Sequence, residues 1–348
     1  MNCEPGGEAG FYALSHEDQA ACMRELATLA LAQWDIGAAQ LELVKYRENA
    51  VFSASAGDGT RYAVRIHRAG YHTDAELRSE LQWMAALADH GIEEPALLPT
   101  CAGGAFAVVS GGGVPEPRQI DVFAWVEGRP LGATETGVAD PGAVSANYYT
   151  IGALAARLHN QASGWTLPAG FTRHAWDAPA LVGPAPLWGP FWELEALTEV
   201  ERALLLRARE RVARDLEAYA AAPGNADRYS LIHADFVVEN LIVDGDRVRL
   251  IDFDDAGFGW HLFELATALY FEMEADYFER AYAALVAGYR SQRELSEEQL
   301  QYMPLFFLAR SFTYLGWVHT RFETETAREL TPMLVVKACK LARDYLRE

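Results

Sequence analysis

The chain has 348 residues, of which 51% are hydrophobic and 22% are charged, a composition typical of a folded protein rather than a disordered one. Its 49 acidic and 29 basic residues give a net charge of −20, which argues against nucleic acid and an anionic membrane surface as partners because both would repel it. The acidity either favours a cationic small substrate or only keeps the protein in solution. At this length two domains or two lobes are expected.

Neither membrane insertion nor secretion is indicated. The apolar run at residues 305–318 is interrupted by Arg310. The N-terminal residues lack the basic stretch followed by an apolar core that a signal peptide requires. No disulfide framework or metal-binding spacing is found among the four cysteines, which are Cys3, Cys22, Cys101 and Cys339. We therefore expect a soluble protein of the reducing cytoplasm.

Residues 1–127 predict a mostly antiparallel sheet with one main helix. A first helix is expected to begin at Ser15, where Asp18 completes a capping box. The main helix begins at Thr73, which Glu76 caps, and ends before Gly91. Asp58-Gly59 is a hairpin signal. The strand-like runs, rich in Val, Tyr and Ile, are residues 40–46, 50–56, 61–67, 105–110 and 119–126.

Residues 128–348 predict a larger and mostly helical region. Two short strands, residues 240–243 and 248–251, flank an Asp-Gly turn. The proline-rich and aromatic segment 173–192 is expected to be irregular. Its tryptophans, Trp176, Trp188 and Trp192, either form a lid over a substrate or pack between helices. Helices are expected at residues 148–161, 196–221 and through most of 262–348. The fold class is therefore α+β.

The segment from Ser230 to Asp255 carries a pattern with chemical meaning. His233 precedes Asp235 by two residues, Asn240 follows five residues later, and Asp252 stands after a short strand. This set suits phosphoryl transfer, in which one carboxylate accepts the proton of an attacking hydroxyl. An Asn and a second carboxylate supply the hard oxygen ligands that Mg²⁺ prefers. The pattern predicts Asp235 as the base and Asn240 and Asp252 as the magnesium ligands.

The same segment, "IHADFVVENLIV…LIDFDD", resembles the aminoglycoside phosphotransferase and homoserine kinase superfamily, whose motif reads H-G-D-x4-N…I-D-F-D. The resemblance implies a bilobal, protein-kinase-like fold, with a β-rich nucleotide-binding N-lobe at residues 1–127 and a helical C-lobe at residues 128–348. It implies ATP and Mg²⁺ as cofactors and a hydroxyl group as the acceptor. Within the superfamily the chain looks closest to the branch of stress-response and homoserine-kinase-like proteins.

The resemblance also assigns residues in the N-lobe. Arg65 falls on the position of the strand lysine that binds phosphates, and Glu80 falls on the helix glutamate that pairs with it. Residues 122–128 resemble the hinge that binds adenine. The cofactor-binding set implied by the resemblance is Arg65, Glu80, Asn49, Trp125 and Glu127.

Three features depart from the family and protein-kinase patterns. An arginine, Arg65, replaces the lysine of protein kinases, although its planar fork is also a good phosphate ligand. No G-x-G-x-x-G motif occurs in residues 46–54, so the phosphate-covering loop differs. Glu264 stands where the family has Asp, and we expect it to brace the catalytic loop by hydrogen bonds.

Other polar residues near the motif have two interpretations each. Glu239 and Asp255 either bind a substrate ammonium group or face solvent. Asp254 either joins Asp252 at a second Mg²⁺ or turns the chain. His233 is implied by the resemblance to pack and hydrogen-bond rather than react. Core positions rather than site positions are expected for Trp260, His261, Trp317 and His319.

The sequence therefore supports a kinase that phosphorylates a small, amine-bearing molecule such as homoserine, an amino alcohol or an aminoglycoside. Two alternatives stay open at this point. A Ser/Thr protein kinase of the stress-response type belongs to the same superfamily, although no A-P-E motif follows Asp252. An inactive nucleotide-binding scaffold is disfavoured because Asp235, Asn240 and Asp252 are all retained. The acceptor, the choice between ATP and GTP and the oligomeric state are not determined by the sequence.

Overall fold

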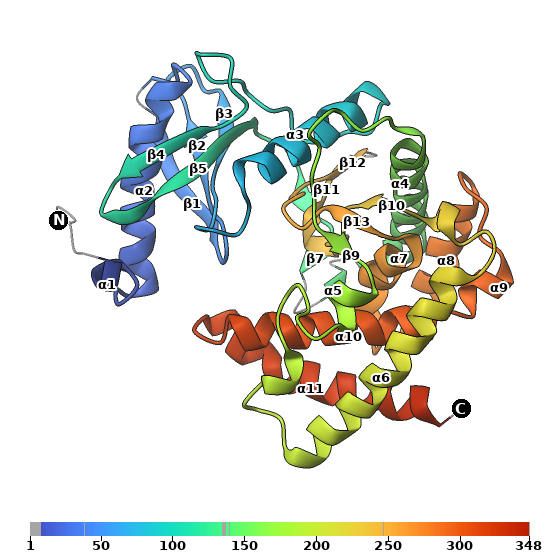
Figure 1. Cartoon of the computed structure of the whole chain (residues 1–348). Coiled ribbons are helices and arrows are strands. Elements are labelled where there is room, and N and C mark those ends of the chain that lie inside the picture. The colour runs from blue at the N-terminus through green and yellow to red at the C-terminus, as the bar shows by residue number, and fades with distance from the viewer. Residues whose placement is uncertain (1–7, 38, 134–136, 139, 246, 348) are drawn as a thin grey trace. The chain divides into compact units, whose positions relative to one another are not determined.

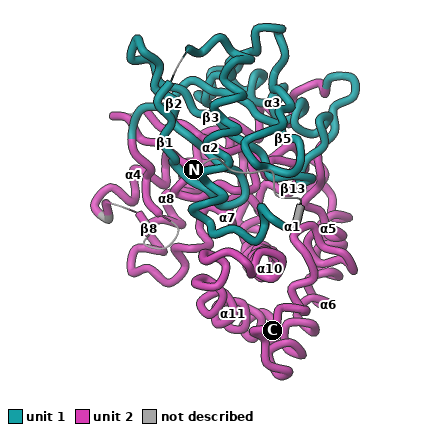
Figure 2. Tube along the Cα trace, turned by 90° about the vertical axis from the view of Figure 1, so that its left-hand side faces the viewer, with its two compact units in different colours: residues 1–128, 168–172 teal, residues 129–167, 173–348 magenta. Residues whose placement is uncertain are grey.

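The computed structural model describes residues 8–37, 39–133, 137–138, 140–245 and 247–347 (Figure 1). The chain divides into two compact units, which Figure 2 colours separately. Unit 1 contains residues 1–128 and 168–172, and unit 2 contains residues 129–167 and 173–348. Among the described helices, none is long and apolar enough to cross a membrane.

Unit 1 is built on an antiparallel sheet with strand order β1-β2-β3-β5-β4. The predicted Asp58-Gly59 turn joins β2 and β3, with Gly59 at a φ of 88° and Asp58 accepting the backbone N–H of Thr60 at 2.9 Å. The strands are β1 (Gln40–Tyr46), β2 (Ala50–Ser55), β3 (Arg61–Ile66), β4 (Ala107–Gly111) and β5 (Val114–Ala124).

Two helices accompany this sheet, and their capping residues were predictable. Ser15 caps α2 (His16–Ala30), which buries an apolar face against the sheet in one core cluster that includes Leu26, Phe52 and Val64. Thr73 and Glu76 form the predicted capping box of α3 (Asp74–Asp89), in which each side chain accepts a hydrogen bond from the backbone N–H of the other residue. Short helical segments are α1 (Glu8–Phe11) and η1 (Leu31–Gln33).

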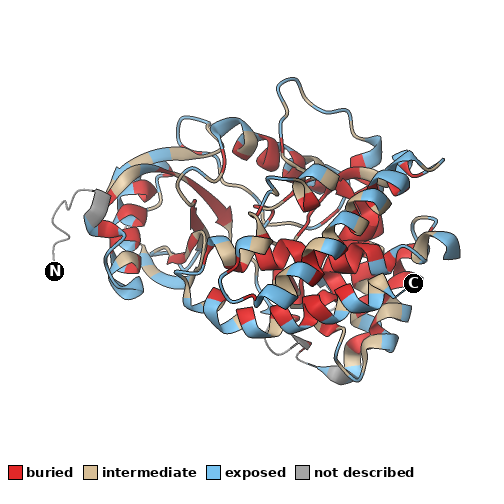
Figure 3. Cartoon of the chain, turned by 60° about the horizontal axis from the view of Figure 1, so that its bottom comes forward, coloured by how far each residue is buried: buried red, intermediate tan, exposed pale blue. Residues whose placement is uncertain are grey.

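Unit 2 is mainly helical, and its buried residues lie on the inner faces of packed helices (Figure 3). The helices are α4 (Val144–Gly164), α5 (Ala178–Val182), α6 (Glu199–Ala221), α7 (His261–Leu269), α8 (Phe278–Arg290), α9 (Glu297–Leu300), α10 (Met303–Thr320) and α11 (Glu325–Leu346). The 3-10 turns are η2 (Pro141–Ala143), η3 (Phe191–Glu193), η4 (Ala226–Arg228), η5 (Val238–Asn240) and η6 (Tyr270–Glu272).

The short strands of unit 2 form small sheets. The orders are β12-β11-β6, β10-β13-β9 and β7-β8. The strands are β6 (Arg129–Pro130), β7 (Gly132–Ala133), β8 (Gly137–Val138), β9 (Ala175–Trp176), β10 (Tyr229–Ile232), β11 (Leu241–Asp244), β12 (Arg247–Leu250) and β13 (Gly257–Trp260). The hairpin of β11 and β12 is the predicted one, and it carries Asn240 before its first strand and Asp252 after its second.

Several sequence expectations differ from the structure. β5 begins at Val114 rather than Gln119, and α4 begins at Val144 rather than Tyr148. The segment 173–192 contains β9 and α5, so it is more regular than predicted. β10 and β13 were not predicted, because they pair across a long loop and lack the Asp-Gly turn that marks the equally short β11 and β12. Of the cysteines, Cys3 lies outside the described residues.

Candidate active site

The predicted catalytic loop, residues 233–240, begins where β10 ends, and a carboxylate from α7 holds its backbone. Glu264 is fully buried, and its two oxygens accept the N–H groups of His233 and Ala234, each at 2.7 Å. Ala234 has a φ of 64°, a conformation that an alanine adopts only at a cost in free energy. The family motif quoted above has glycine at this position. The two hydrogen bonds to Glu264 therefore hold a strained turn directly before Asp235.

Asp235 is the half-buried carboxylate of this loop, with a side chain that is 25% exposed. The amide nitrogen of Asn240 donates to Asp235 Oδ2 at 2.8 Å and to its backbone oxygen at 2.9 Å. The guanidinium of Arg310 lies 3.3 Å from Asp235 Oδ1. Both oxygens of the predicted base are thus oriented by partners within the same unit.

Asp252 follows β12 and is connected to the catalytic loop through its neighbour Ile251. The N–H of Ile251 donates to the backbone oxygen of Asn240 at 2.9 Å, and His233 Nε2 contacts the oxygen of Ile251 at 3.0 Å. Asp252 is exposed and has a φ of 65°, another left-handed conformation outside glycine. Strained backbone of this kind is concentrated at functional sites.

Asn240 and Asp252 fit a magnesium site by their chemistry. Because the amide nitrogen of Asn240 is used by Asp235, its oxygen Oδ1 is the atom that can serve a cation. Asp252 adds a solvent-facing carboxylate. Mg²⁺ prefers hard oxygen ligands and takes only one or two from carboxylates. The donor set therefore suits Mg²⁺ better than a softer metal.

The turn after Asp252 is held by the aromatic segment that precedes α5. Arg173 is buried, and its guanidinium donates to the backbone oxygens of Asp254 and Ala256. Trp176 donates its indole N–H to the oxygen of Asp255 at 3.0 Å. Trp176 is fully buried, so it supports the turn from the core and does not form an exposed lid.

A buried histidine lies beside the residue that braces the loop. His159 Nε2 is 3.8 Å from Glu264 Oε1, and its Nδ1 lies 2.9 Å from the hydroxyl of Tyr289. Burial lowers the pKa of His159 below its ordinary value, against the opposing influence of Glu264. His159 also stacks on His261, with 4.0 Å between ring centroids.

In unit 1 the predicted ion pair of Arg65 and Glu80 is present, and Asp121 and His67 extend it to a cluster of four side chains. Arg65 Nη2 lies 2.7 Å from Glu80 Oε1, and both side chains are buried. Asp121, opposite Arg65 on β5, accepts Nε at 3.0 Å and Nη2 at 2.7 Å, while His67 contacts Asp121 Oδ2 at 3.0 Å. Burial opposes the ionisation of Asp121, but Arg65 and His67 outweigh it and lower its pKa to about 2.

The other predicted nucleotide residues have local partners in unit 1. Asn49 accepts the backbone N–H of Arg68 at 3.0 Å, which ties the turn after β1 to the end of β3. The guanidinium of Arg61 lies 4.0 Å above the ring of Trp125 and 3.5 Å from Glu127. The backbone N–H of Trp125 already donates to the backbone oxygen of Arg61 at 3.2 Å. Any hinge donor for adenine would therefore come from another residue of 122–128.

The remaining site predictions are placed as follows. Glu239 and Asp255 are half-buried, and their contact with a substrate ammonium group stays a prediction. Asp254 is buried, and its backbone oxygen accepts a hydrogen bond from Arg173 in the turn after Asp252. Trp188 is buried, whereas Trp192 is half-buried and lies under the guanidinium of Arg209.

Sequence reasoning missed several residues that contact the predicted set. The main ones are Asp121, which binds Arg65, Arg173, which holds the turn after Asp252, and Arg310, which contacts Asp235. For Asp121 and Arg310 a signal existed, since each is the charged residue within a largely apolar run, residues 120–126 and 305–318 respectively. Such a residue requires a buried partner. Arg173 offered no comparable signal.

Comparison with known proteins gives a family match over most of the chain. The model described as "Phosphotransferase enzyme family" matches residues 42–300. This range includes β2, β3 and α3 of unit 1 and the catalytic loop of unit 2. It contains every predicted site residue.

Individual relatives agree with this match. The structure of a microcompartment-associated aminopropanol kinase is 32% identical with a TM-score of 0.81, covering 93% of this chain and 98% of that one. A homoserine kinase of Sinorhizobium fredii (strain NBRC 101917 / NGR234) is 28% identical and covers 82% of this chain and 83% of its own. Amicoumacin kinase hAmiN, solved with AMP-PNP, Ca²⁺ and Ami, shares the fold with a TM-score of 0.74 at 18% identity, covering 95% and 96%.

Proposed function

This chain belongs to the phosphotransferase enzyme family and is a small-molecule kinase with a protein-kinase-like fold, and from that premise we propose which residues carry its reaction. The proposed reaction transfers the terminal phosphoryl group of ATP to a hydroxyl of an amine-bearing metabolite. The observation that carries the proposal is the arrangement around Asp235. Its carboxylate is oriented by Asn240, and it follows a strained turn that Glu264 holds in place.

In unit 2, Asp235 orients the acceptor hydroxyl and accepts its proton as the acceptor oxygen bonds to the γ-phosphorus of ATP and the bond from that phosphorus to ADP breaks. Asn240 and Asp252 would hold Mg²⁺, which neutralises charge on the phosphates when bound. His233 and Glu264 keep the loop in shape through backbone hydrogen bonds. No covalent intermediate is needed, since positioning and charge stabilisation account for such transfers.

In unit 1, Arg65 would bind the α- and β-phosphates of the nucleotide, and Glu80 would fix its direction. Asp121 joins them as a second carboxylate partner that occupies Nε and Nη2 of Arg65. Asn49, Trp125 and Glu127 stay predictions for the nucleotide site. ATP as donor is supported by the AMP-PNP bound in the amicoumacin kinase structure.

The acceptor is proposed to be a small molecule with an amino group, in the range from amino alcohols to hydroxy amino acids and aminoglycosides. The named relatives act on aminopropanol, homoserine and amicoumacin, and the net charge of −20 suits a cationic substrate. Glu239 and Asp255 are the proposed partners of its ammonium group. These relatives also favour a small acceptor over the protein substrate that the sequence left open. A cytoplasmic location stays a prediction.

The proposal is tested by ADP release from Mg·ATP with a panel of acceptors. The panel contains 1-amino-2-propanol, ethanolamine, choline, homoserine, an aminoglycoside, a simple sugar and a Ser/Thr protein substrate. We expect one amine-bearing small molecule to raise ADP release far above the rate without acceptor. Glu239→Gln and Asp255→Asn should then raise KM for that molecule more than KM for Mg·ATP.

Three results would contradict the proposal. Turnover with the protein substrate alone would assign a protein kinase activity. Turnover with the sugar, and with none of the amines, would remove the ammonium group from the substrate definition. Failure of Mg·ATP to bind, measured by calorimetry, would contradict the kinase assignment itself.

A further inference from the structure

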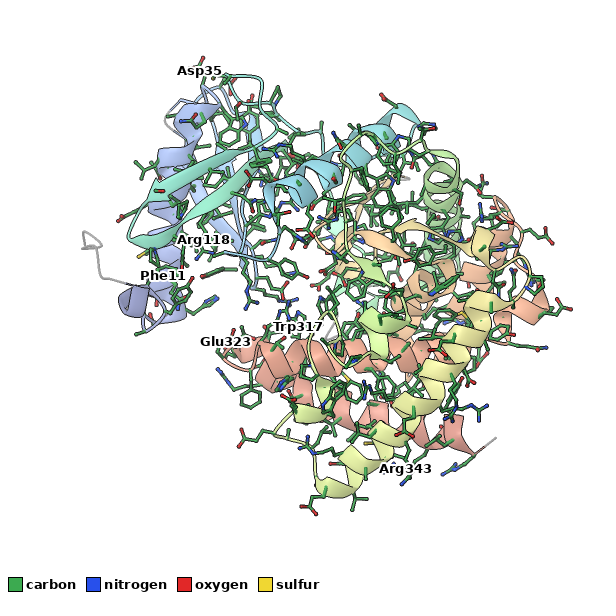
Figure 4. All side chains as sticks on the ribbon, in the orientation of Figure 1. Phe11, Asp35, Arg118, Trp317, Glu323 and Arg343 are labelled. Carbon is green, nitrogen blue, oxygen red and sulfur yellow. The ribbon has the colours of Figure 1, made fainter. Side chains whose placement is uncertain are left out.

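Arg310 stands at a position where an arginine is costly. It lies within α10, where the residues from Met303 to Gly316 are buried apart from Pro304, and its own side chain is fully buried. Figure 4 labels Trp317, which lies on the same helix nearer its C-terminal end. A buried charge destabilises a fold unless a partner compensates it. The identity of that partner therefore indicates why the arginine is there.

The ionic partner recorded for Arg310 among the described residues is Asp235. Arg310 Nη2 lies 3.3 Å from Asp235 Oδ1 and donates to the hydroxyl of Tyr314 at 2.9 Å. Within the described chain, Nε and Nη1 have no hydrogen-bond acceptor. Three aromatic rings surround the guanidinium carbon, with centroids at 4.1 Å for Tyr314, 5.0 Å for Trp188 and 5.4 Å for Phe263.

Burial decides how Arg310 can act. With no exposed surface, it cannot touch a nucleotide or an acceptor directly. The cation is therefore available to a ligand only through Asp235, which is partly exposed. The aromatic rings fix the plane of the guanidinium and exclude water, which strengthens its electrostatic interaction with the carboxylate.

We propose that Arg310 is a positioning residue that orients the catalytic carboxylate of Asp235, a role that rests on the proposed function of Asp235 as the base. Arg310 holds Oδ1 from α10, and Asn240 holds Oδ2 from η5. Two constraints from separate elements prevent rotation of the carboxylate. The acceptor hydroxyl then meets a base of fixed direction, a condition on which catalysis by proximity depends.

The test compares Arg310→Met with Arg310→Lys in the full chain. Mg·ATP is the phosphoryl donor, and 1-amino-2-propanol, homoserine and water are the acceptors of the phosphoryl group. Methionine keeps much of the side-chain volume without the charge, and the carboxylate it leaves behind, Asp235, is partly exposed and keeps its hydrogen bond from Asn240, which limits the cost of removing one partner of the ion pair. We expect Arg310→Met to lower kcat by about 100-fold, the effect of a misplaced catalytic group, with KM for Mg·ATP unchanged. Lysine keeps the charge but loses the planar fork, so we expect kcat to fall by only about tenfold.

A matched control is Lys337→Met, which removes another buried cation of unit 2. Lys337 lies on α11, and its amino group donates to the backbone oxygen of Tyr270 at 3.1 Å. This variant should change thermal stability while leaving kcat unaltered. The decisive readout is the combination with Asp235→Asn. Because Arg310 acts through Asp235, Arg310→Met should cause no further loss of kcat in that background.

Wild-type kcat in both folded Arg310 variants would overturn this role and leave the proposed function standing. An undiminished effect of Arg310→Met in the Asp235→Asn background would also overturn it. If Arg310→Met does not fold, Arg310→Lys decides the question by the same comparison with Asp235→Asn. Absence of turnover in the wild-type protein with all acceptors would instead overturn the proposed function, and the role of Arg310 with it.

Discussion

At the scale of single residues, the turn before Asp235 combines a strained backbone at Ala234 with a buried carboxylate, Glu264, that stabilises it. Ala234 occupies a left-handed conformation that glycine adopts at no steric cost. Glu264 compensates by accepting the two N–H groups at that turn. The longer side chain of glutamate, compared with the family's aspartate, still reaches both groups. The direction of Asp235 therefore depends on a residue on another element.

This dependence predicts the effect of Glu264→Gln. The amide would present an NH₂ group to one of the two backbone donors, which leaves a buried N–H without an acceptor. We expect a loss of about 1–3 kcal/mol in the free energy of unfolding, together with lower kcat. Thermal denaturation and ADP release measure the two effects.

Glu201→Gln is the matched control, since Glu201 accepts the backbone N–H and the hydroxyl of Thr198 at the start of α6, away from the site. It should leave kcat unchanged. If Glu264→Gln retained both wild-type stability and wild-type kcat, the supporting role of Glu264 would be wrong.

The sequence predicted residues whose neighbours are local or belong to a known motif, and it missed partners that arrive from distant segments. Arg65 and Glu80 were paired through the family pattern, and the structure contains that pair. Asp121 reaches Arg65 through cross-strand register, which a single sequence does not specify. Arg310 is 75 residues from Asp235 in the chain, so only the packing of α10 brings them together.

At the scale of elements, α4 and α8 cross with almost no space between their backbones. A Cβ atom at Gly152 would lie 2.0 Å from the backbone oxygen of Leu285, and one at Gly288 would lie 1.9 Å from that of Tyr149. Two glycines, one on each helix, therefore permit this close approach. Helical periodicity predicted that α4 exists, but it gives no information about which helix packs on it.

Gly152→Ala should consequently destabilise the protein, although alanine is the better helix former. The clash is with backbone, so it can be relieved only by separating the helices, at a cost of about 1–3 kcal/mol or more. Differential scanning fluorimetry measures the change.

Gly164→Ala provides the control on the same helix, because a Cβ atom there meets nothing within 4 Å. This variant should be as stable as the wild type or slightly more stable. Equal stability of the two variants would contradict the close packing of α4 on α8.

At the scale of the whole molecule, the sequence was most informative about fold class and reaction type. The β-rich first part, the helical second part and the H-x-D-x4-N pattern together led to the kinase family, which the family match and the aminopropanol kinase structure confirm. The acceptor was not predictable, because the proposed partners of its ammonium group, Glu239 and Asp255, belong to no general motif. The division of roles between the two units stays a prediction.

The central claim is that Asp235 is the base of a small-molecule kinase, and Asp235→Asn tests it most directly. Mg·ATP binding is measured by calorimetry, and ADP release is measured with the acceptor found in the panel. Asp344→Asn, the same change at an exposed carboxylate of α11, is the control. We predict that Asp235→Asn binds Mg·ATP like the wild type and loses kcat by about 100-fold or more, the usual contribution of a general base. Turnover comparable to that of Asp344→Asn would contradict the account.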